Sequence, residues 1–320
     1  MFAAYAARID KDQPLNGLQL GERPEPDVRP GWTTVTVKAA SLNHHDLWTL
    51  RGVGIKEDAF PMILGCDAAG IDEDGNEVVV HSVIGQTGHG VGPDEPRSLL
   101  TERYQGTFAE RVTVPAWNLL PKPKELSFEE ATCLPTAWLT AYRMLFTNAN
   151  VRPGQSVLVQ GAGGGVATAA IVLGAAAGLR VFATSRDEAK RRRAVELGAE
   201  DAFEPGARLP HRVDAVIETV GAATWSHSVK SLKPGGTLVI SGATSGPNPS
   251  AVELTRVFFL ELRIVGSTMG SKEELADLLA FCAATGVRPV IDSVLPLDRA
   301  REGLERMAEG ELFGKVVLTV

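Results

Sequence analysis

The sequence contains few cysteines. Only three occur among 320 residues, and Cys66, Cys133 and Cys282 stand far apart without the spacing of a metal-binding pair. A disulfide framework and a structural zinc site are therefore not indicated, and the cysteine content fits a reducing cytoplasm.

Long apolar runs and excess positive charge are also missing. No uninterrupted apolar stretch could span a bilayer, and the N-terminal residues lack a cationic start followed by a long apolar core. The net charge of −7, from 32 basic and 39 acidic residues, argues against general nucleic-acid binding. We therefore expect a cytoplasmic protein that binds neither membranes nor nucleic acid, and its length favours two domains.

A glycine-rich segment at residues 157–190 organises the rest of the chain. An apolar run at 157–160 precedes the turn GAGGG at 161–165, a small-residue helix that ends near residue 178, and a second apolar run at 181–184. This order of strand, turn, helix and strand is typical of a dinucleotide-binding unit, in which free N–H groups at the helix start bind the pyrophosphate. A tight turn without a ligand is the alternative. The turn residues that we expect at the cofactor are Gly161, Gly163, Gly164, Gly165 and Val166.

The end of the second strand predicts NADPH as the cofactor. An NAD enzyme usually has an acidic residue there, but this chain has Ser185, with Arg186 and Lys190 nearby. A hydroxyl and two cations would bind a 2′-phosphate, which a carboxylate would repel. Two other interpretations stay open: Ser185 and Glu188 can form a helix capping box, and the basic run at 190–193 can be a solvated helix face.

Alternating apolar strands and helices predict an α/β fold with a doubly wound parallel sheet in the C-terminal half. Further strands are expected at 213–218, 237–241 and 264–266. Ligands bind at the carboxyl ends of such strands. The residues expected there are Thr219, Val220, Ser241, Gly242, Ala243, Ser267, Thr268 and Met269, the last three near the nicotinamide.

The first part of the sequence is rich in predicted strands. Short runs at 33–38, 78–84 and 108–114 are separated by proline and glycine, which is typical of a barrel-like domain that would supply substrate contacts. From about residue 272 the chain should return to this domain, with helices at 273–284 and 298–310 and strands at 290–295 and 315–320. We thus predict a substrate domain at 1–123 and 273–320, and a dinucleotide-binding domain at 124–272.

Several separate motifs resemble the medium-chain dehydrogenase/reductase superfamily. They are ASLNHHDLWTLRG at 40–52, LGCDAAG at 64–70, GNEV at 75–78, GTFAE at 106–110, LPTAWLTAY at 134–142 and GKVVL at 314–318. The resemblance covers nearly the whole chain and implies a GroES-like catalytic domain, a Rossmann domain, and a homodimer or homotetramer. It also implies that Thr140 approaches the nicotinamide and that Lys315 lies near the cofactor phosphates. A surface role for Lys315 is the alternative.

The resemblance further implies that the catalytic zinc of some relatives is absent here. Zinc alcohol dehydrogenases of this superfamily bind the metal with Cys, His and Cys, which align with Asn43, Cys66 and Thr136. Only Cys66 is a usual zinc ligand, and a catalytic site needs three protein ligands. The loop that corresponds to their structural-zinc loop, at 85–106, has no cysteine. A different metal site built from His44, His45 and His81 is the alternative.

The remaining pattern resembles the zinc-independent quinone oxidoreductase branch, which has Asn43 followed by Asp46 and the pattern Gly-x-Asp-x-Ala-Gly at 65–70. This implies reduction of quinones, or of the activated C=C bonds of enones and enals, with NADPH. The resemblance places Asn43 at the nicotinamide and Trp48 in the substrate pocket.

His45 matches the position of a proton-relay hydroxyl in the zinc enzymes, so we predict it as a proton donor, with His44 as the alternate; local packing or capping is the competing role. Two other functions remain open. One is a zinc-dependent alcohol dehydrogenase with unusual ligands, and the other is a nucleotide-binding redox sensor without turnover.

Overall fold

The computed structural model describes residues 1–86, 90–92 and 95–320, so part of the 85–106 loop lies outside the described residues. The chain divides into two compact units: unit 1 comprises Met1–Leu139 and Gly270–Val320, and unit 2 comprises Thr140–Met269. Unit 1 includes helix α2 (Phe128–Ala131), which packs on strands of that unit. Among the described residues, no helix is both long enough and apolar enough to cross a bilayer.

Unit 1 is built mainly from antiparallel strands, as predicted for a GroES-like domain. The largest sheet has the order β10-β6-β5-β3-β18-β17, with β9 also paired to β3. Its strands are β3 (Trp32–Ser41), β5 (Asp67–Asp72), β6 (Glu77–Val80), β9 (Arg111–Pro115), β10 (Leu119–Pro121), β17 (Ile291–Pro296) and β18 (Lys315–Thr319). The smaller sheets contain β2 (Leu18–Glu22), β1 (Phe2–Ala6) and β4 (Met62–Ile63), and β7 (Val83–Gly85) with β8 (Arg97–Leu99).

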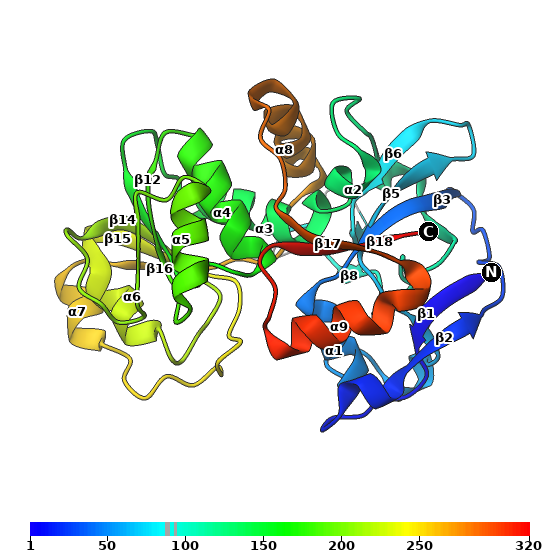
Figure 1. The fold of residues 1–320 in the computed structure, drawn as a ribbon, viewed down its shortest axis with the longest axis horizontal. Helices are drawn as coiled ribbons and strands as arrows, with labels where there is room; N and C mark the ends of the chain where they lie inside the picture. The colour runs from blue at the N-terminus through cyan, green and yellow to red at the C-terminus, as the bar shows by residue number, and fades with distance from the viewer. Residues whose placement is uncertain (87–89, 93–94) are drawn as a thin grey trace. The chain divides into compact units, whose positions relative to one another are not determined.

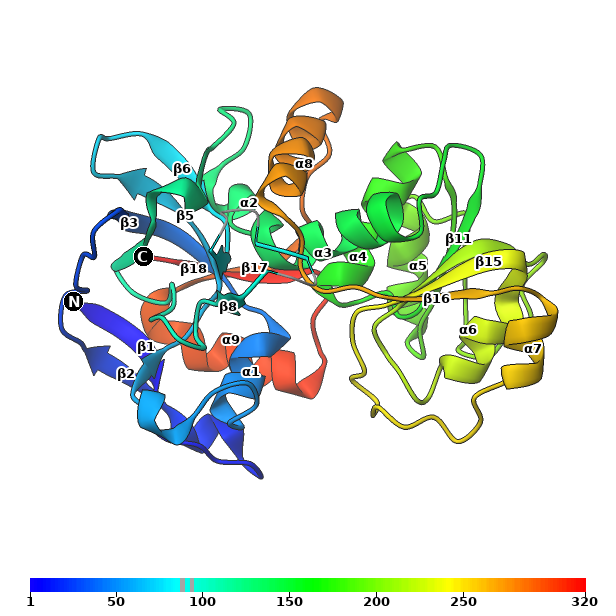
Figure 2. The same cartoon turned by 180° about the vertical axis from the view of Figure 1, so that it is seen from behind.

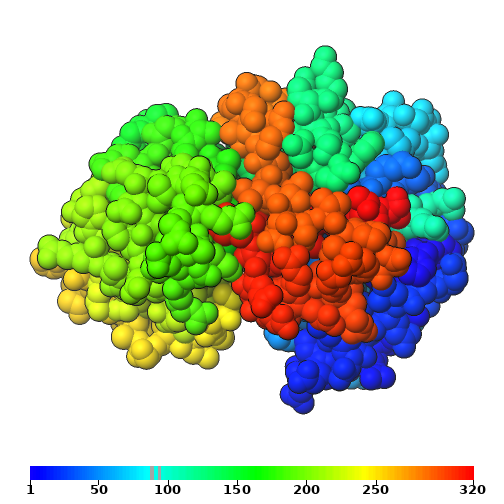
Figure 3. Space-filling view, in the orientation of Figure 1, coloured from blue at the N-terminus to red at the C-terminus, as the bar shows by residue number. Residues whose placement is uncertain are grey.

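The return of the C-terminal residues to unit 1 is visible in the sheet. Strand β18 pairs antiparallel with β3, so that Val317 lies opposite Ser41. In Figures 1 and 3 the orange and red C-terminal residues lie against the blue N-terminal ones. Helix α8 (Lys272–Thr285) ends at Gly286, which has a φ of +74°, close to the predicted end. The expected strand at 78–84 is instead divided into β6 and β7, because the Asn118 amide binds the backbone carbonyls of His81 and Val83.

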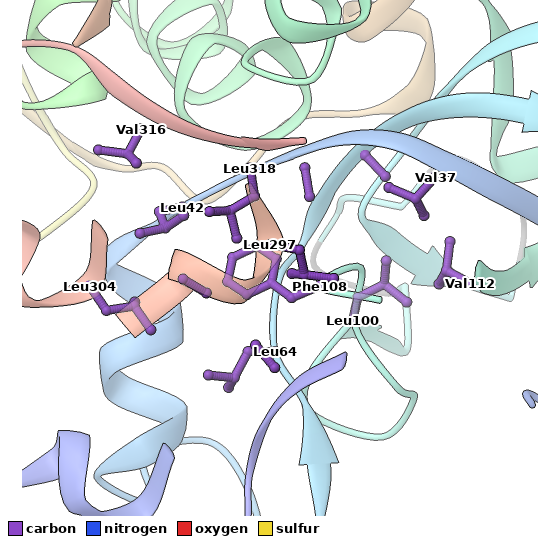
Figure 4. Packing of buried hydrophobic residues seen from close by; sticks show 14 of the residues in the cluster. Val37, Leu42, Leu64, Leu100, Phe108, Val112, Leu297, Leu304, Val316 and Leu318 are labelled. Atoms are coloured by element: carbon purple, nitrogen blue, oxygen red, sulfur yellow. The ribbon is translucent and has the colours of Figure 1, made fainter. Parts of the chain in front are cut away.

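The core of unit 1 forms where helix α9 (Ala300–Glu309) covers the large sheet. Ala300, Leu304 and Met307 repeat at helical spacing and are buried. Figure 4 shows Leu297 and neighbouring apolar side chains from the strands gathered around Phe108. Burying a side chain of this size stabilises the fold by about 1.5–3 kcal/mol. This core holds β3, β5 and β18 in one register.

Unit 2 is a doubly wound α/β domain, which confirms the predicted fold class. Its six parallel strands have the order β13-β12-β11-β14-β15-β16. They are β11 (Ser156–Val159), β12 (Arg180–Thr184), β13 (Asp201–Phe203), β14 (Val213–Glu218), β15 (Leu232–Ile240) and β16 (Arg263–Gly266). The helices between them are α4 (Gly165–Ala176), α5 (Glu188–Glu196), α6 (Trp225–Ser231) and α7 (Leu254–Phe259). Figure 2 shows β15 and β16 side by side at the edge near α7.

Candidate functional site

Unit 1 contains a buried polar cluster at the ends of three adjacent strands. We call it the Asp67 cluster; it comprises Ser41, Asn43, Asp67, Ser82 and Lys315. Because Ser41 lies opposite both Asp67 in β5 and Val317 in β18, the register brings the start of β5, the end of β3 and the start of β18 together. Asp67 is fully buried, Lys315 is 3% exposed and Asn43 is 7% exposed.

The Asp67 carboxylate is surrounded by donors. Its Oδ2 accepts hydrogen bonds from Ser41 Oγ and from Asn43 Nδ2, each at 2.8 Å, and lies 3.4 Å from Lys315 Nζ. Ser82 Oγ donates to its other oxygen at 3.4 Å. A buried carboxylate needs such partners because it has lost its water.

Lys315 is the cation of this cluster, and its expected place near the cofactor phosphates stays a prediction. Its Nζ donates to Leu42 O at 2.5 Å and to Asn43 Oδ1 at 2.7 Å. Together with Asp67, these oxygens account for the three N–H donors of the ammonium group. The buried ammonium group is therefore fully hydrogen-bonded within unit 1.

Asn43 also takes part in this cluster, and its expected place at the nicotinamide stays a prediction. Its amide nitrogen donates to Asp67 and its amide oxygen accepts from Lys315. Both ends of the side chain are therefore hydrogen-bonded inside the protein. Asn43 is also the N-cap of helix α1 (His44–Leu50), where it forms a capping box with Asp46.

Asp46 and the Gly65–Asp67 segment are locked together. Asp46 accepts hydrogen bonds from Asn43 N at 2.8 Å and from Gly65 N at 3.0 Å, and burial raises the pKa of its carboxyl to about 7. Gly65 has a φ of +92°, and a Cβ atom there would lie 2.3 Å from the Phe108 ring. Only glycine therefore fits at this position of the sequence motif.

The residues at the aligned zinc-ligand positions do not suit a zinc ion. Cys66 is buried, its Sγ donates to Leu100 O at 3.4 Å, and burial raises the pKa of the thiol well above its ordinary value. Zinc needs the thiolate, and the Asn43 amide is already held by a cation. Thr136 Oγ1 is 3.3 Å from Ser82 Oγ. Throughout residues 1–86, 90–92 and 95–320, no three His, Cys, Asp or Glu side chains come close enough to hold a metal ion, which argues against the alternative histidine site.

The two candidate proton donors lie at the start of α1. His45 Nε2 is buried and has no hydrogen-bond partner among the described residues. Burial lowers the pKa of His45, while the Glu102 carboxylate opposes the shift, so the imidazole is mainly neutral near pH 7. His44 and Trp48 are four residues apart and exposed, which places them on the outward face of the helix.

The glycine-rich turn of unit 2 has the geometry that a pyrophosphate requires. Gly161 follows β11 with a φ of +88°, and α4 begins after Gly164, whose position has no side-chain cap. The first N–H groups of α4 therefore keep their capacity to bind an anion. Gly163, Gly165 and Val166 lie in the same turn and first helical residues.

The segment after β12 differs in one respect from the expectation. The cap of α5 is Asp187, whose Oδ1 accepts from Ala189 N at 2.7 Å and Lys190 N at 3.2 Å, so the capping box between Ser185 and Glu188 is wrong. Asp187 directly precedes the first helical residue, so its side chain caps the helix. Its carboxylate is thereby directed to the α5 backbone, while Arg186 is exposed.

Arg191 is a further cation at this segment that the sequence alone did not single out. Its Nη1 donates to Ser185 O at 2.7 Å and to Arg186 O at 3.3 Å. The sequence did contain a signal for Arg191, because it follows Asp187 by four residues, a spacing that brings two side chains together on a helix. Arg192, in the same basic run, pairs instead with Glu188 at 2.7 Å.

The other predicted cofactor residues of unit 2 gather at the carboxyl edge of the parallel sheet. They follow β14, β15 and β16 in turn, and the first two loops are joined by hydrogen bonds such as Ser245 N to Val220 O at 2.7 Å. Thr219, Ser241, Gly242 and Ala243 belong to these loops, and Ser267, Thr268 and Met269 follow β16. Thr140 lies in α3 (Leu139–Tyr142) and is 6% exposed.

A parallel sheet with an uncapped glycine turn, in one chain with an antiparallel GroES-like unit, defines a nucleotide-dependent oxidoreductase. Comparison with known proteins agrees. Residues 29–124 match the alcohol dehydrogenase GroES-like domain family, and residues 165–284 match the zinc-binding dehydrogenase family. The chain belongs to the medium-chain dehydrogenase/reductase superfamily and is an NAD(P)-dependent oxidoreductase.

Three similar proteins illustrate the range of this superfamily. A zinc-type alcohol dehydrogenase-like protein of Schizosaccharomyces pombe is 31% identical over 319 residues, covering 92% of each chain. The crystal structure of an NAD-dependent alcohol dehydrogenase is 35% identical, with a TM-score of 0.91 and 100% of both chains covered. An acryloyl-coenzyme A reductase of Sulfurisphaera tokodaii is 28% identical over 325 residues, covering 95% of this chain and 97% of the relative.

Proposed function

We propose that this chain is an NADPH-dependent reductase that works without zinc and reduces quinones or the activated C=C bonds of enones and enals. The observation that carries the proposal is the ammonium group of Lys315, which binds Asn43 and Asp67 at 2.7 and 3.4 Å. The buried carboxylate is already paired, so a divalent ion would have to displace an internal cation. Close charges of the same sign repel each other strongly in such an environment.

The preference for NADPH is supported by the segment that follows β12. Ser185, Arg186 and Lys190 supply a hydroxyl and two cations after β12, and Arg191 adds a cation to the same turn, which supports binding of a 2′-phosphate. The Asp187 carboxylate is engaged by backbone N–H groups of α5. A phosphate is therefore favoured over a ribose hydroxyl, which would need a free acidic acceptor.

A bound nicotinamide supplies the hydride in this class of reaction. The protein must hold the coenzyme and acceptor in place and provide a proton for the reduced product. His45 is our candidate for the second task, because its Nε2 is unpartnered among the described side chains. Burial lowers the pKa of His45, so the protonated form that donates is populated mainly at lower pH, and reduction should be faster there. Reduction of a C=C bond is also the activity in the name of the acryloyl-coenzyme A reductase to which the chain is similar.

The similarity to an NAD-dependent alcohol dehydrogenase supports a second candidate function, oxidation of alcohols with NAD. The two functions separate in one experiment. Purified chain is screened spectrophotometrically with NADPH and NADH against quinones, enals and enones, and with NADP and NAD against alcohols, while its zinc content is measured by mass spectrometry. We expect turnover of an enone or quinone with NADPH that survives a chelator. Stoichiometric zinc, or alcohol oxidation with NAD that the chelator abolishes, would favour the second candidate.

A further inference from the structure

A continuous set of buried hydrogen bonds connects the two turns at the cofactor end of unit 2. We call it the Glu218 network; it comprises Gln160, Thr184, Glu218, Thr224, His227 and Ser228. Thr184, Gln160 and Glu218 stand at or next to the carboxyl ends of β12, β11 and β14, which are neighbours in the sheet. Their side chains are at most 1% exposed.

One side of the network holds the glycine turn. The N–H group of Gly161 donates to Thr184 Oγ1 at 3.1 Å, and the Thr184 hydroxyl donates to Gln160 Oε1 at 2.8 Å. The Gln160 amide nitrogen then donates to Ser228 Oγ and to His227 Nδ1, each at 3.0 Å. Each of these groups has one consistent direction of donation, so the network specifies one arrangement.

The other side holds the turn that follows β14. Glu218 Oε1 accepts from Val220 N at 2.7 Å and Gly221 N at 3.0 Å, while Oε2 accepts from Thr224 Oγ1 at 2.8 Å and Ser228 Oγ at 2.6 Å. Gly161 and Gly221 have φ values of +88° and +92°. Each turn therefore contains a left-handed glycine whose N–H group the network holds.

We propose that Thr184, Gln160 and Glu218 are positioning residues for the NAD(P) coenzyme, because they fix the glycine turn and the 219–222 turn relative to each other. Burying a carboxylate and an amide gives little stability beyond that of apolar side chains of the same size. What the network adds is a single geometry at the edge where the coenzyme binds. Without it the turns would sample other conformations, and the apparent affinity would fall with the competent fraction.

The test compares two substitutions at Thr184. T184V keeps the branched shape but leaves the Gly161 N–H and the Gln160 carbonyl without their partner, whereas T184S keeps the hydroxyl. The dissociation constants of NADPH and NADH are measured by fluorescence titration of the full chain, and folding is followed by circular dichroism. We expect T184V, which loses both hydrogen bonds of the Thr184 hydroxyl, to weaken binding of the tighter coenzyme by at least about tenfold, and T184S to bind like the unmodified protein.

A second pair controls for stability alone. E218Q replaces one carboxylate oxygen with an NH2 group that cannot accept hydrogen bonds. This variant should also weaken coenzyme binding about tenfold. D214N removes a negative charge at the opposite end of β14, where Asp214 accepts from Ser156 N at 2.8 Å and pairs with Lys233 at 2.8 Å. It should lower the melting temperature without changing the dissociation constant.

Unchanged coenzyme affinity in T184V would overturn the proposal, and this variant decides the matter if E218Q does not fold. The proposal rests on NAD(P) dependence, not on a preference for NADPH. Failure of the unmodified chain to bind either coenzyme would therefore refute the function itself, which is a different result from tight binding that the variants leave unaltered.

Discussion

Replacing Lys315 with methionine removes the ammonium group from the Asp67 cluster while keeping most of the side-chain volume. The carboxylate of Asp67, which is fully buried, then loses its cation, and the Asn43 and Leu42 oxygens lose their donor. Removing one partner of a buried ion pair costs about 3–5 kcal/mol. Since domains are stable by about 5–15 kcal/mol, this is a large fraction of the total.

The assay is the free energy of unfolding from urea titration, supported by the melting temperature. For a domain of about 150–250 residues, each kcal/mol lowers the melting temperature by about 2–4 °C, so K315M should lower it by about 6–20 °C. Adding D67N removes the unpaired charge and should restore about 2 kcal/mol or more. K38M, at an exposed lysine of β3, is the control and should change stability by less than about 0.5 kcal/mol. A loss below about 1 kcal/mol in K315M, or additive losses in the double variant, would refute the internal ion pair.

Four further predictions concern the other groups of the site. H45A should lower kcat for the reduced acceptor about a hundredfold, as expected for a general acid; equal turnover at every pH would exclude this role. The pKa of Asp46 is raised from 3.8 to about 7, so the folded protein binds this proton more tightly than the unfolded chain does. The stability should therefore fall as the pH rises from about 4 to 7, measured as a decrease in melting temperature. D46N should remove this pH dependence. S185D should weaken NADPH about tenfold and spare NADH, measured as the ratio of kcat/KM; an unchanged ratio would contradict the assigned phosphate contact. Phe258 and Phe259 of α7 are 69% and 78% exposed beside the edge strand β16, and we propose that they pack against a second copy of the chain. Replacing both with serine should give monomers in analytical ultracentrifugation. A parent chain that is already monomeric would count against the homo-oligomer.

The dinucleotide-binding half was largely predictable because its signals are local. The apolar run at 157–160, the glycine turn and the small-residue helix are adjacent in sequence, and β14 has the predicted bounds Val213–Glu218. The short strand β13 was missed, since three residues carry too little pattern. Asp187 and not Ser185 caps α5, because the helix begins at Glu188. Sequence preferences predict such a starting point only to within a few residues.

The Asp67 cluster was not predictable for a different reason. Lys315 meets Asn43 only through the pairing of β18 with β3, and a shift of one residue would turn every side chain of β18 to the other face. The motif around Lys315 indicated a functional position but not its partners. The Glu218 network left a weaker signal, because Gln160 and Glu218 are polar residues at the ends of apolar strands.

Two of the buried acidic side chains, Asp67 in unit 1 and Glu218 in unit 2, allow the roles of the two units to be separated. Asp67 is paired with an ammonium group, whereas Glu218 is held by backbone N–H groups and hydroxyls of its own turn. A change at Lys315 should therefore alter the stability of unit 1, with coenzyme affinity retained in the folded protein. A change at Glu218 should weaken coenzyme binding and leave the stability of unit 1 unaltered. If K315M weakened NADPH as much as E218Q does, the two clusters would act on one common element, and the assignment of separate roles would be wrong.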